Sequence, residues 1–321
     1  MTNKPPVLYV VLPCFNEQEA LPQSHMRLLR LMEEMIAQGC IGEESKLLFV
    51  DDGSRDNTWA IIQQLAQECN RVAGVKLTCN SGHQYALMAG LATAVERCDI
   101  MVSIDADLQD DINVIPEMVR RYGEGCDIVF GVRRLRKSDT WFKRTTASWF
   151  YSLMKQLGVS TIENHADFRL MSRRAVLALL DYRERNLFIR GIVTKLGYKT
   201  ACVYYDRTKR IAGESKYPLH KMMNLAIDCI TSFSVKPVRL VFTVGVLFLI
   251  IALMMLIYVL WTYFMGRAVS GWSSLILSVW LIGALILIAL GIIGEYVGKI
   301  YTEVKNRPRY NIDTTAGLKP K

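Results

Sequence analysis

The sequence predicts an α/β fold with a mainly parallel sheet, followed by a C-terminal part that associates with a membrane. In the N-terminal part of the chain, short apolar runs typical of buried strands alternate with helical patterns, as in βαβ units. Farther along, the segments 240–264 and 272–294 contain no charged residue. Each is long enough to cross a bilayer as a helix, which takes about 20 residues.

The apolar runs and helical patterns can be placed along the chain. Strands are expected at 7–12, 47–50, 75–78, 100–104 and 128–132, and helices at 17–38, 58–68, 84–97 and 114–122. Strands that are covered on both faces have continuous apolar sequences, as these do. Ligands of such sheets bind outside the carboxyl ends of the strands, so the residues after each run are the candidates for a site.

The most informative of these strand ends carries Asp105 and Asp107, two carboxylates that flank Ala106 where an apolar run meets a polar loop. Mg²⁺ and Mn²⁺ take oxygen ligands and often bridge carboxylates to substrate phosphates. An Asp-x-Asp triplet alone is a weak signal, because acidic residues also cap loops and helices. The polar segments 13–17 and 51–58, which follow the first two runs, strengthen the signal.

Several motifs occur in the order found in one enzyme family. They are Pro13-Cys14-Phe15-Asn16-Glu17, Asp51-Asp52-Gly53-Ser54, Gly82-His83-Gln84, Asp105-Ala106-Asp107-Leu108-Gln109-Asp110, Asp167-Phe168-Arg169, Arg190-Gly191 and Gly213-Glu214-Ser215-Lys216. In this order the chain resembles, over nearly its whole length, the inverting family-2 glycosyltransferases of GT-A fold. It is most similar to their polyprenyl-phosphate branch, the relatives of dolichyl-phosphate mannose synthase and bacterial polyprenyl-phosphate glucosyltransferases.

The resemblance implies roles for particular residues. Asp107 and Asp105 would bind the metal, Mg²⁺ or Mn²⁺, and Asp167 would be an acceptor-side carboxylate that orients the acceptor or acts as a base. These three are the expected catalytic residues. The nucleotide sugar would be bound by Pro13, Phe15, Asn16, Glu17, Asp52, His83, Asp105, Ala106 and Asp107. The phosphates of the donor or of the lipid would be bound by Arg133, Arg190, Arg210 and Lys216.

The implied reaction is the transfer of a hexose from a UDP- or GDP-linked sugar to a polyprenyl phosphate of the undecaprenyl or dolichyl type. The product would serve cell-envelope glycan synthesis or lipid modification. One alternative is a family-2 transferase with another lipid or glycan acceptor. The other is a membrane scaffold with a degenerate nucleotide-sugar domain, which the intact acidic strand ends disfavour.

The expected organisation has four parts. A glycosyltransferase domain of GT-A type spans 1–215, an amphipathic juxtamembrane segment 216–239, two transmembrane helices lie within 240–298, and a basic tail spans 299–321. Lysines and arginines are frequent before the first apolar segment and after the second, whereas the connection between them has only Arg267. The positive-inside rule therefore predicts a multi-pass protein of the inner (cytoplasmic) membrane, with its catalytic domain and both termini cytoplasmic.

The net charge and the cysteines indicate the kind of binding partner and the cellular compartment. The net charge of +9 suits a nucleic acid or an anionic membrane surface, and the clustering of basic residues beside the apolar segments favours the membrane. No nucleic-acid partner is therefore expected, while assembly into a homo-oligomer is left open. The eight cysteines form no Cys-x-x-Cys pair, which is typical of reduced thiols in a cytoplasmic domain.

Overall fold

The structure is a computed structural model that describes residues 4–134, 165–184, 188–206 and 271–318, with isolated positions between 241 and 265. The chain divides into two compact units. One comprises Met1–Ser152, Ser160–Lys216 and Arg307–Lys321, and the other Leu153–Val159 and Tyr217–Asn306. The first unit therefore contains residues from both sides of the apolar part of the chain.

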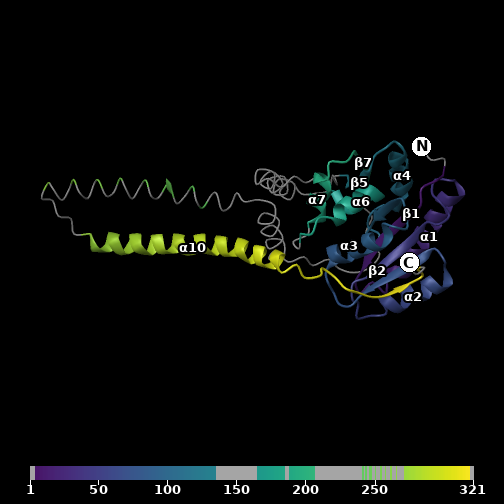
Figure 1. The fold of residues 1–321 in the computed structure, drawn as a ribbon, viewed down its shortest axis with the longest axis horizontal. Coiled ribbons are helices and arrows are strands. Elements are labelled where there is room, and N and C mark those ends of the chain that lie inside the picture. Colours follow the sequence, from purple (N-terminus) through teal and green to yellow (C-terminus); the bar gives the residue numbers. More distant parts are fainter. Residues whose placement is uncertain are drawn as a thin grey trace. The chain divides into compact units, whose positions relative to one another are not determined.

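An eight-stranded sheet forms the centre of the first unit, among the residues that the structure describes (Figure 1). Its strands are β1 (Leu8–Cys14), β2 (Lys46–Asp51), β3 (Val72–Leu77), β4 (Ile100–Ser103), β5 (Ile128–Arg133), β6 (His165–Ser172), β7 (Thr200–Tyr205) and β8 (Ile312–Ala316). Their order across the sheet is β7-β5-β6-β4-β1-β2-β3-β8. The five strands expected from the apolar runs are all present, which confirms the α/β prediction.

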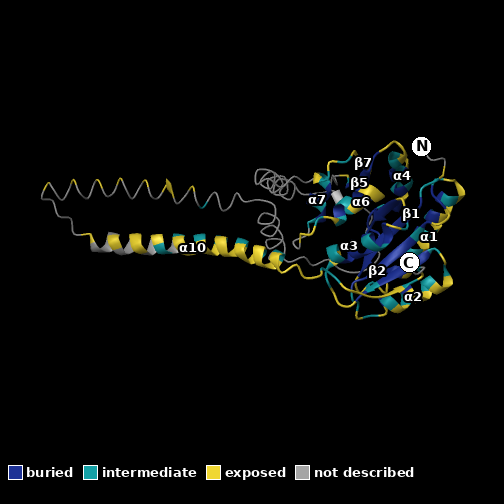
Figure 2. Cartoon of the chain, viewed as in Figure 1, coloured by how far each residue is buried: buried dark blue, intermediate teal, exposed yellow. Residues whose placement is uncertain are grey.

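Helices alternate with the first five strands, as predicted. The helices of this unit are α1 (Leu21–Ala37), α2 (Thr58–Glu68), α3 (His83–Ala94), α4 (Ile115–Gly123), α6 (Arg173–Leu180) and α7 (Ile189–Lys195), with a short 3-10 helix η1 (Ile112–Val114) before α4. Helix α3 packs on β1 and β2, and α2 packs on β3. Every residue of β1 is buried, and the inner strands form the dark centre of Figure 2.

Strand β6 determines where the site lies, and the sequence patterns did not predict it. The pairs β1/β2, β1/β4, β2/β3 and β5/β7 are parallel, whereas β6 runs antiparallel between β4 and β5. Ser103 at the end of β4 pairs with Arg169, and Val132 near the end of β5 pairs with His165. The first residues of β6 therefore lie at the carboxyl ends of its neighbours.

Strand β8 lies at the edge of the sheet, antiparallel to β3. Its register pairs Gly74 with Ala316 and Lys76 with Thr314, and Thr78 N donates to Asn311 O at 3.0 Å just beyond it. The sequence was expected to form a basic tail over 299–321, but residues 299–304 continue a helix and 312–316 complete the sheet. The strand is mostly exposed and polar, so it lacks the apolar run by which the inner strands are recognised.

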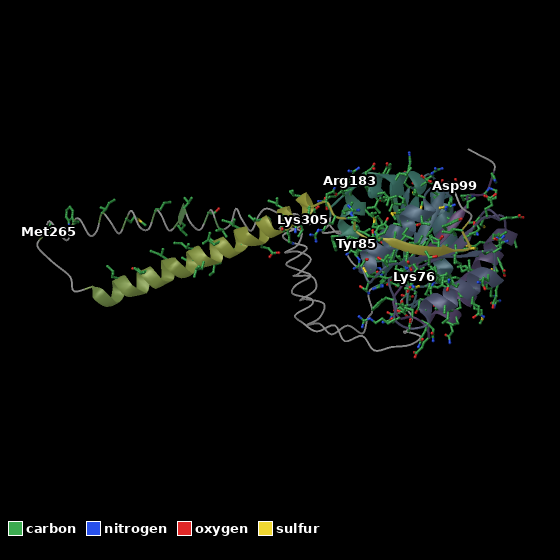
Figure 3. The ribbon with its side chains drawn as sticks, turned by 60° about the horizontal axis from the view of Figure 1, so that its bottom comes forward. Lys76, Tyr85, Asp99, Arg183, Met265 and Lys305 are labelled. Atoms are coloured by element: carbon green, nitrogen blue, oxygen red, sulfur yellow. The ribbon has the colours of Figure 1, made fainter. Side chains whose placement is uncertain are left out.

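The second unit contains one long apolar helix among its described residues, α10 (Trp272–Val304). Its 33 residues extend about 50 Å at 1.5 Å per residue, more than a hydrocarbon core of roughly 30 Å requires. The helix contains the predicted segment 272–294 and continues to Val304, and Leu285–Val304 qualifies as a candidate membrane span. Apolar side chains along it are exposed (Figures 2 and 3). This observation indicates membrane association.

The other predicted membrane segment, 240–264, lies largely outside the described residues, as does most of the juxtamembrane segment 216–239. Scattered positions between 241 and 261 are helical, including exposed Ile250, Met254 and Ile257. The two-helix hairpin therefore remains a prediction at this stage.

Candidate active site

Polar residues from several elements gather at the carboxyl edge of the parallel strands. Asp51 ends β2, Asp105 follows β4, and Arg133 ends β5. Because β6 is antiparallel, Asp167 near its beginning joins them, and Ser103 Oγ of β4 donates to the backbone oxygen of Asp167 at 2.5 Å. The sheet topology thus brings three of the predicted motifs to one place.

His83 connects two predicted carboxylates. It begins α3, and its Nε2 lies 3.5 Å from Asp105 Oδ1 and 3.8 Å from Asp167 Oδ2. Its side chain is 43% exposed, so a ligand can reach it from solvent. The predicted metal residue, the predicted acceptor-side carboxylate and His83 therefore form one cluster.

Asp167 is held between two guanidinium groups. Arg169 Nη2 donates to its Oδ1 at 2.5 Å, while Arg190 donates to Oδ1 and Oδ2 at 3.1 and 2.9 Å. Burial alone would raise the pKa of Asp167, but Arg169 and Arg190 hold this pKa well below its usual range. A carboxylate that remains ionised is a poor proton acceptor at neutral pH, so this environment favours an orienting role over a base.

Arg169 was quoted only as part of a motif, yet it is the largest fully buried side chain of the described residues. Its Nε and Nη1 atoms are buried without a hydrogen-bond partner among them. A buried guanidinium is costly unless a counter-ion compensates it, and Asp167 supplies that charge. The only local signal for its burial is the pair of apolar neighbours Phe168 and Leu170 in β6, a strand that the sequence patterns did not predict.

Asp105 and Asp107 offer carboxylate oxygens of the kind that a hard cation takes as ligands, and metal binding by them remains a prediction. Burial raises the pKa of Asp105, as do the nearby carboxylates of Asp167, Asp110 and Asp107, although His83 opposes the increase. A cation would relieve this accumulation of negative charge. No cluster of three or more His, Cys, Asp or Glu side chains suited to a metal occurs in the described part of the chain. Two carboxylates nevertheless suffice for Mg²⁺ that is bound mainly through phosphates and water.

The turn after β1 is joined to the loop after β2. Asn16 adopts a left-handed conformation with φ of 54°, its backbone N donates to Ser54 Oγ at 3.0 Å, and its Oδ1 accepts from Arg55 N at 2.9 Å. Glu17 N donates to Thr58 Oγ1 at 2.9 Å. Pro13 lies in β1, whereas Phe15 is 42% exposed. The two loops thus form one wall beside the acidic cluster, and nucleotide binding by this wall remains a prediction.

Asp52 is engaged in holding the loop that leads to His83. Its two carboxylate oxygens accept from Ser81 N at 2.7 Å and Gly82 N at 2.9 Å. Gly53 allows the close approach: its φ is +66°, and a Cβ there would lie 2.6 Å from Asn80 N. In this conformation Asp52 shapes the pocket, and its predicted contact with base or ribose stays a prediction.

The predicted phosphate ligands are only partly described. Arg190 pairs with Asp167, and Arg133 pairs with Asp110, with Arg133 Nη2 and Asp110 Oδ1 3.0 Å apart. Arg210 and Lys216 lie outside the described residues. Ala106, the remaining predicted residue, is buried, and its carbonyl accepts from Ser24 Oγ at 2.6 Å. Ser24, Asp110 and Tyr205 line this region as well and were not among the predicted residues.

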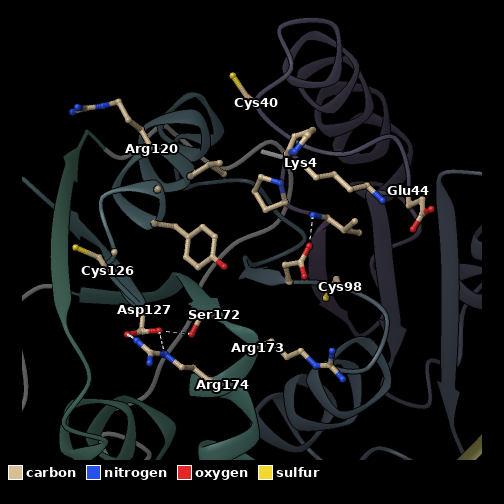
Figure 4. Close-up of a pocket in the computed structure, with 18 of the residues that line it drawn as sticks. Lys4, Cys40, Glu44, Cys98, Arg120, Cys126, Asp127, Ser172, Arg173 and Arg174 are labelled. Carbon is tan, nitrogen blue, oxygen red and sulfur yellow. Dashed lines mark hydrogen bonds and ion pairs between the residues drawn. The ribbon is translucent and has the colours of Figure 1, made fainter. Parts of the chain in front are cut away.

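A hollow of the described structure lies at the opposite, amino edge of the sheet. It has a volume of about 1430 Å³ and is lined by residues that precede the strands, including Val7, Asp99 and Asp127. Figure 4 shows that Asp127 is paired there with Ser172 and Arg174. This amino edge carries none of the predicted site residues, so the charged cluster at the carboxyl edge is the candidate active site.

The domain thus combines a mainly parallel, GT-A-like sheet with an acidic cluster at the carboxyl edge of its strands. The family model "Glycosyl transferase family 2" matches residues 9–180. The chain therefore belongs to glycosyltransferase family 2, and it is an enzyme of that class.

Individual relatives cover nearly the whole chain. It is 50% identical over 313 residues to the uncharacterized glycosyltransferase YkoT of Bacillus subtilis (strain 168), covering 98% of this chain and 93% of YkoT. It is 41% identical over 308 residues to the prophage bactoprenol glucosyl transferase homolog of Escherichia coli (strain K12), covering 94% and 97%. A solved structure, the Pyrobaculum calidifontis mannosyltransferase PcManGT in complex with GDP-Man and Mn²⁺, aligns at 14% identity and a TM-score of 0.42, covering 95% and 86%.

Proposed function

We propose that the protein transfers glucose from a nucleotide-diphosphate sugar to a polyprenyl phosphate at the cytoplasmic face of a membrane. The observation that carries this proposal is the near-full-length similarity to the bactoprenol glucosyl transferase homolog. The cluster of carboxylates and guanidiniums at the carboxyl edge supports it, because the reaction brings two phosphate groups to one sugar carbon. The exposed apolar helix α10 supports a lipid acceptor.

In this reaction an oxygen of the lipid phosphate attacks the anomeric carbon as the bond to the nucleotide diphosphate breaks. The electron pair leaves with the diphosphate, and the configuration at the carbon inverts. Since the acceptor is already an anion, positioning and charge compensation matter more than a base. Asp167 in its ionised form would therefore orient Arg190, whose guanidinium suits a phosphate oxygen.

Asp105 and Asp107 would hold Mg²⁺ or Mn²⁺, which supplies positive charge to the departing diphosphate. The wall formed by residues 13–17 and 51–58 would accept the nucleotide, and His83 would face the sugar phosphates from the start of α3. Arg133 at the end of β5 would meet the lipid phosphate. Arg210 and Lys216 are proposed for the same phosphates.

The path of the chain supports a membrane hairpin. Strand β8 follows α10 in sequence and pairs with β3 in the same sheet as β1 to β7. A chain that leaves a folded domain and returns to it crosses a membrane an even number of times. If α10 crosses once, a second crossing must lie between 207 and 271, where 240–264 is uncharged. Together with the basic flanks, this supports a topology in which the domain and both termini are cytoplasmic.

A donor panel tests the proposed reaction. Purified full-length protein would be given Mn²⁺, a short-chain polyprenyl phosphate and one of UDP-glucose, UDP-N-acetylglucosamine or GDP-mannose. We expect a glucosylated lipid phosphate, identified by its mass, from a glucose donor. A lipid product from another donor would revise the sugar, whereas the absence of any lipid product would contradict the polyprenyl-phosphate acceptor.

The hairpin has its own test. A cysteine introduced as Ala268→Cys, in a variant without native cysteines, should react with a membrane-impermeant maleimide from the outside of intact cells. Labelling only after the cytoplasmic side has been exposed would contradict the hairpin.

A further inference from the structure

The loop 105–110, here called the carboxylate loop, ends in a buried ion pair that the proposed reaction does not by itself explain. Asp110 lies three residues after Asp107, and only 2% of its side chain is exposed. Arg133 donates to it through Nε at 3.1 Å and Nη2 at 3.3 Å. A buried carboxylate needs such a partner, because desolvation without pairing is costly. The loop that carries the proposed metal ligands is thereby tied to the end of β5.

Tyr205 completes this arrangement from a third strand. It lies opposite Arg133 in the parallel register of β5 and β7, and Arg133 Nε also donates to its hydroxyl at 3.4 Å. Burial raises the pKa of Tyr205, and a hydrogen bond to the Asp110 carboxylate raises it further. The hydroxyl therefore stays protonated, so it can donate to Asp110 while it accepts from Arg133.

Packing fixes the Tyr205 ring. The ring is 2% exposed and meets Phe168 edge to face, with centroids 5.5 Å apart. Gly131 leaves the necessary space, since a Cβ there would lie 2.8 Å from Phe168 Cδ1 and 3.1 Å from Tyr205 Cε1. Packing of the ring therefore holds the Tyr205 hydroxyl in one position.

The other part of the carboxylate loop is anchored as well. Ser24 Oγ of α1 donates to Ala106 O at 2.6 Å. Leu108, fully buried between the two anchors, has a left-handed φ of 43°. A bulky residue adopts this conformation only where the surrounding structure imposes it. The loop 105–110 is therefore held in one shape from both sides.

We propose that Asp110 and Tyr205 are positioning residues that lock the carboxylate loop to Arg133. Asp110 holds the loop, and the Tyr205 hydroxyl sets the orientation of the Arg133 fork. Arg133 is 28% exposed, and its Nη1 makes no hydrogen bond among the described residues, so one side of the guanidinium is available to a phosphate. The inference rests on the proposed function for Arg133, and it assigns the support of that residue to two side chains with no direct part in the reaction.

The test compares Tyr205→Phe with Tyr204→Phe, its 57% exposed neighbour on the same strand. We expect Tyr205→Phe to raise the KM for polyprenyl phosphate about tenfold, the effect of one hydrogen bond to a charged group. Calorimetric affinity for UDP-glucose with Mn²⁺ should remain unchanged, and Tyr204→Phe should match the wild type. An unchanged acceptor KM in Tyr205→Phe would overturn the role of the hydroxyl.

A double-mutant cycle distinguishes positioning from general stabilisation. Arg133→Lys keeps the charge but loses the fork, so it should raise the acceptor KM alone. If Tyr205 acts through Arg133, the double variant should be no worse than Arg133→Lys. If the two substitutions raise the KM independently, so that the increase in the double variant is the product of the two single increases, Tyr205 does not act through Arg133.

The role of Asp110 in the loop can be tested without turnover. The measurement is the affinity with which the Asp110→Asn and Asp111→Asn variants bind UDP in the presence of Mn²⁺. Asp110→Asn should weaken this affinity and Asp111→Asn should not, since Asp111 caps η1. If the wild type makes no lipid product, the proposed reaction is wrong, but this measurement still tests whether Asp110 positions the carboxylate loop. Equal affinities in both variants would overturn the role of Asp110.

Discussion

The two edges of the sheet differ in how their charged side chains are surrounded. At the amino edge, Asp127 accepts hydrogen bonds from Ser172 and Arg174, and Asp99 accepts from Val7 N. These carboxylates are satisfied by neighbours on adjoining elements. Arg97 Nε is the exception there, since it is buried without a partner among the described residues.

At the carboxyl edge, several charged groups are gathered close together, although some of them are paired, as Asp110 is with Arg133. Asp105, Asp107 and Asp110 lie within one loop, and buried atoms of Asp51 and Arg169 lack partners among the described residues. A hollow of about 1430 Å³ nevertheless lies at the amino edge. The accumulation of charged groups, rather than the presence of a hollow, therefore marks the carboxyl edge as the candidate site, and the following variants test that contrast.

The largest effect is expected from Asp107→Ala at the carboxyl edge. Transfer should fall about a hundredfold or more, because the departing diphosphate loses the cation that matches its charge. The melting temperature should stay near that of the wild type, and Asp111→Ala serves as control. Undiminished formation of lipid product, or full activity in excess chelator, would contradict the metal assignment.

Asp167→Asn should lower transfer more than about tenfold, because Arg190 loses the charge that orients it. Donor affinity measured by calorimetry should remain close to that of the wild type, since the nucleotide wall is formed by other residues. Kinetics must be measured well below the melting temperature, because Arg169 loses its buried counter-ion. A variant that no longer binds the donor, or one that transfers at the normal rate, would remove Asp167 from the acceptor side.

Asp127→Asn provides the contrast at the amino edge, with transfer unchanged and stability lowered. Arg174 holds the pKa of Asp127 below its ordinary value, with a further contribution from Ser172. The pairing therefore stabilises the fold above the unfolded pKa of about 3.9, and this stabilisation is lost as the pH falls through the folded value. Melting temperatures of wild type and variant should differ at pH 7 and converge under acid. Impaired transfer at an unchanged melting temperature would contradict the distinction between the edges.

The smallest effect is expected from Asp313→Ala on β8. Asp313 Oδ2 lies 3.7 Å from Lys76 Nζ, and both side chains are partly exposed. Such a pair contributes less than about 1 kcal/mol and is screened by salt. Denaturant unfolding should show a small loss that disappears in high salt. A loss as large as that from deleting residues 312–321 would indicate that side-chain contacts, rather than backbone pairing, hold β8.

Local patterns were sufficient for the first half of the catalytic domain. The runs around β1 to β5 are apolar because both faces of these strands are covered, and the helix expected at 58–68 is observed with the same bounds. Asp105, Asp107 and His83 were identified from motifs because each follows a strand or begins a helix. The uncharged segment within α10 was equally clear, since crossing a bilayer requires a long apolar run.

What only the tertiary structure decided is the set of neighbours. Strands β6 and β8 have mixed or polar sequences, so no local period reveals them, and their pairing depends on residues distant in the chain. The antiparallel insertion of β6 brings Asp167 and Arg169 to Asp105, and β7 brings Tyr205 to Arg133. The sequence by itself determined the class of enzyme and its apolar segments. The folded sheet decided which charges meet, because contacts between distant strands leave no periodic signal in the sequence.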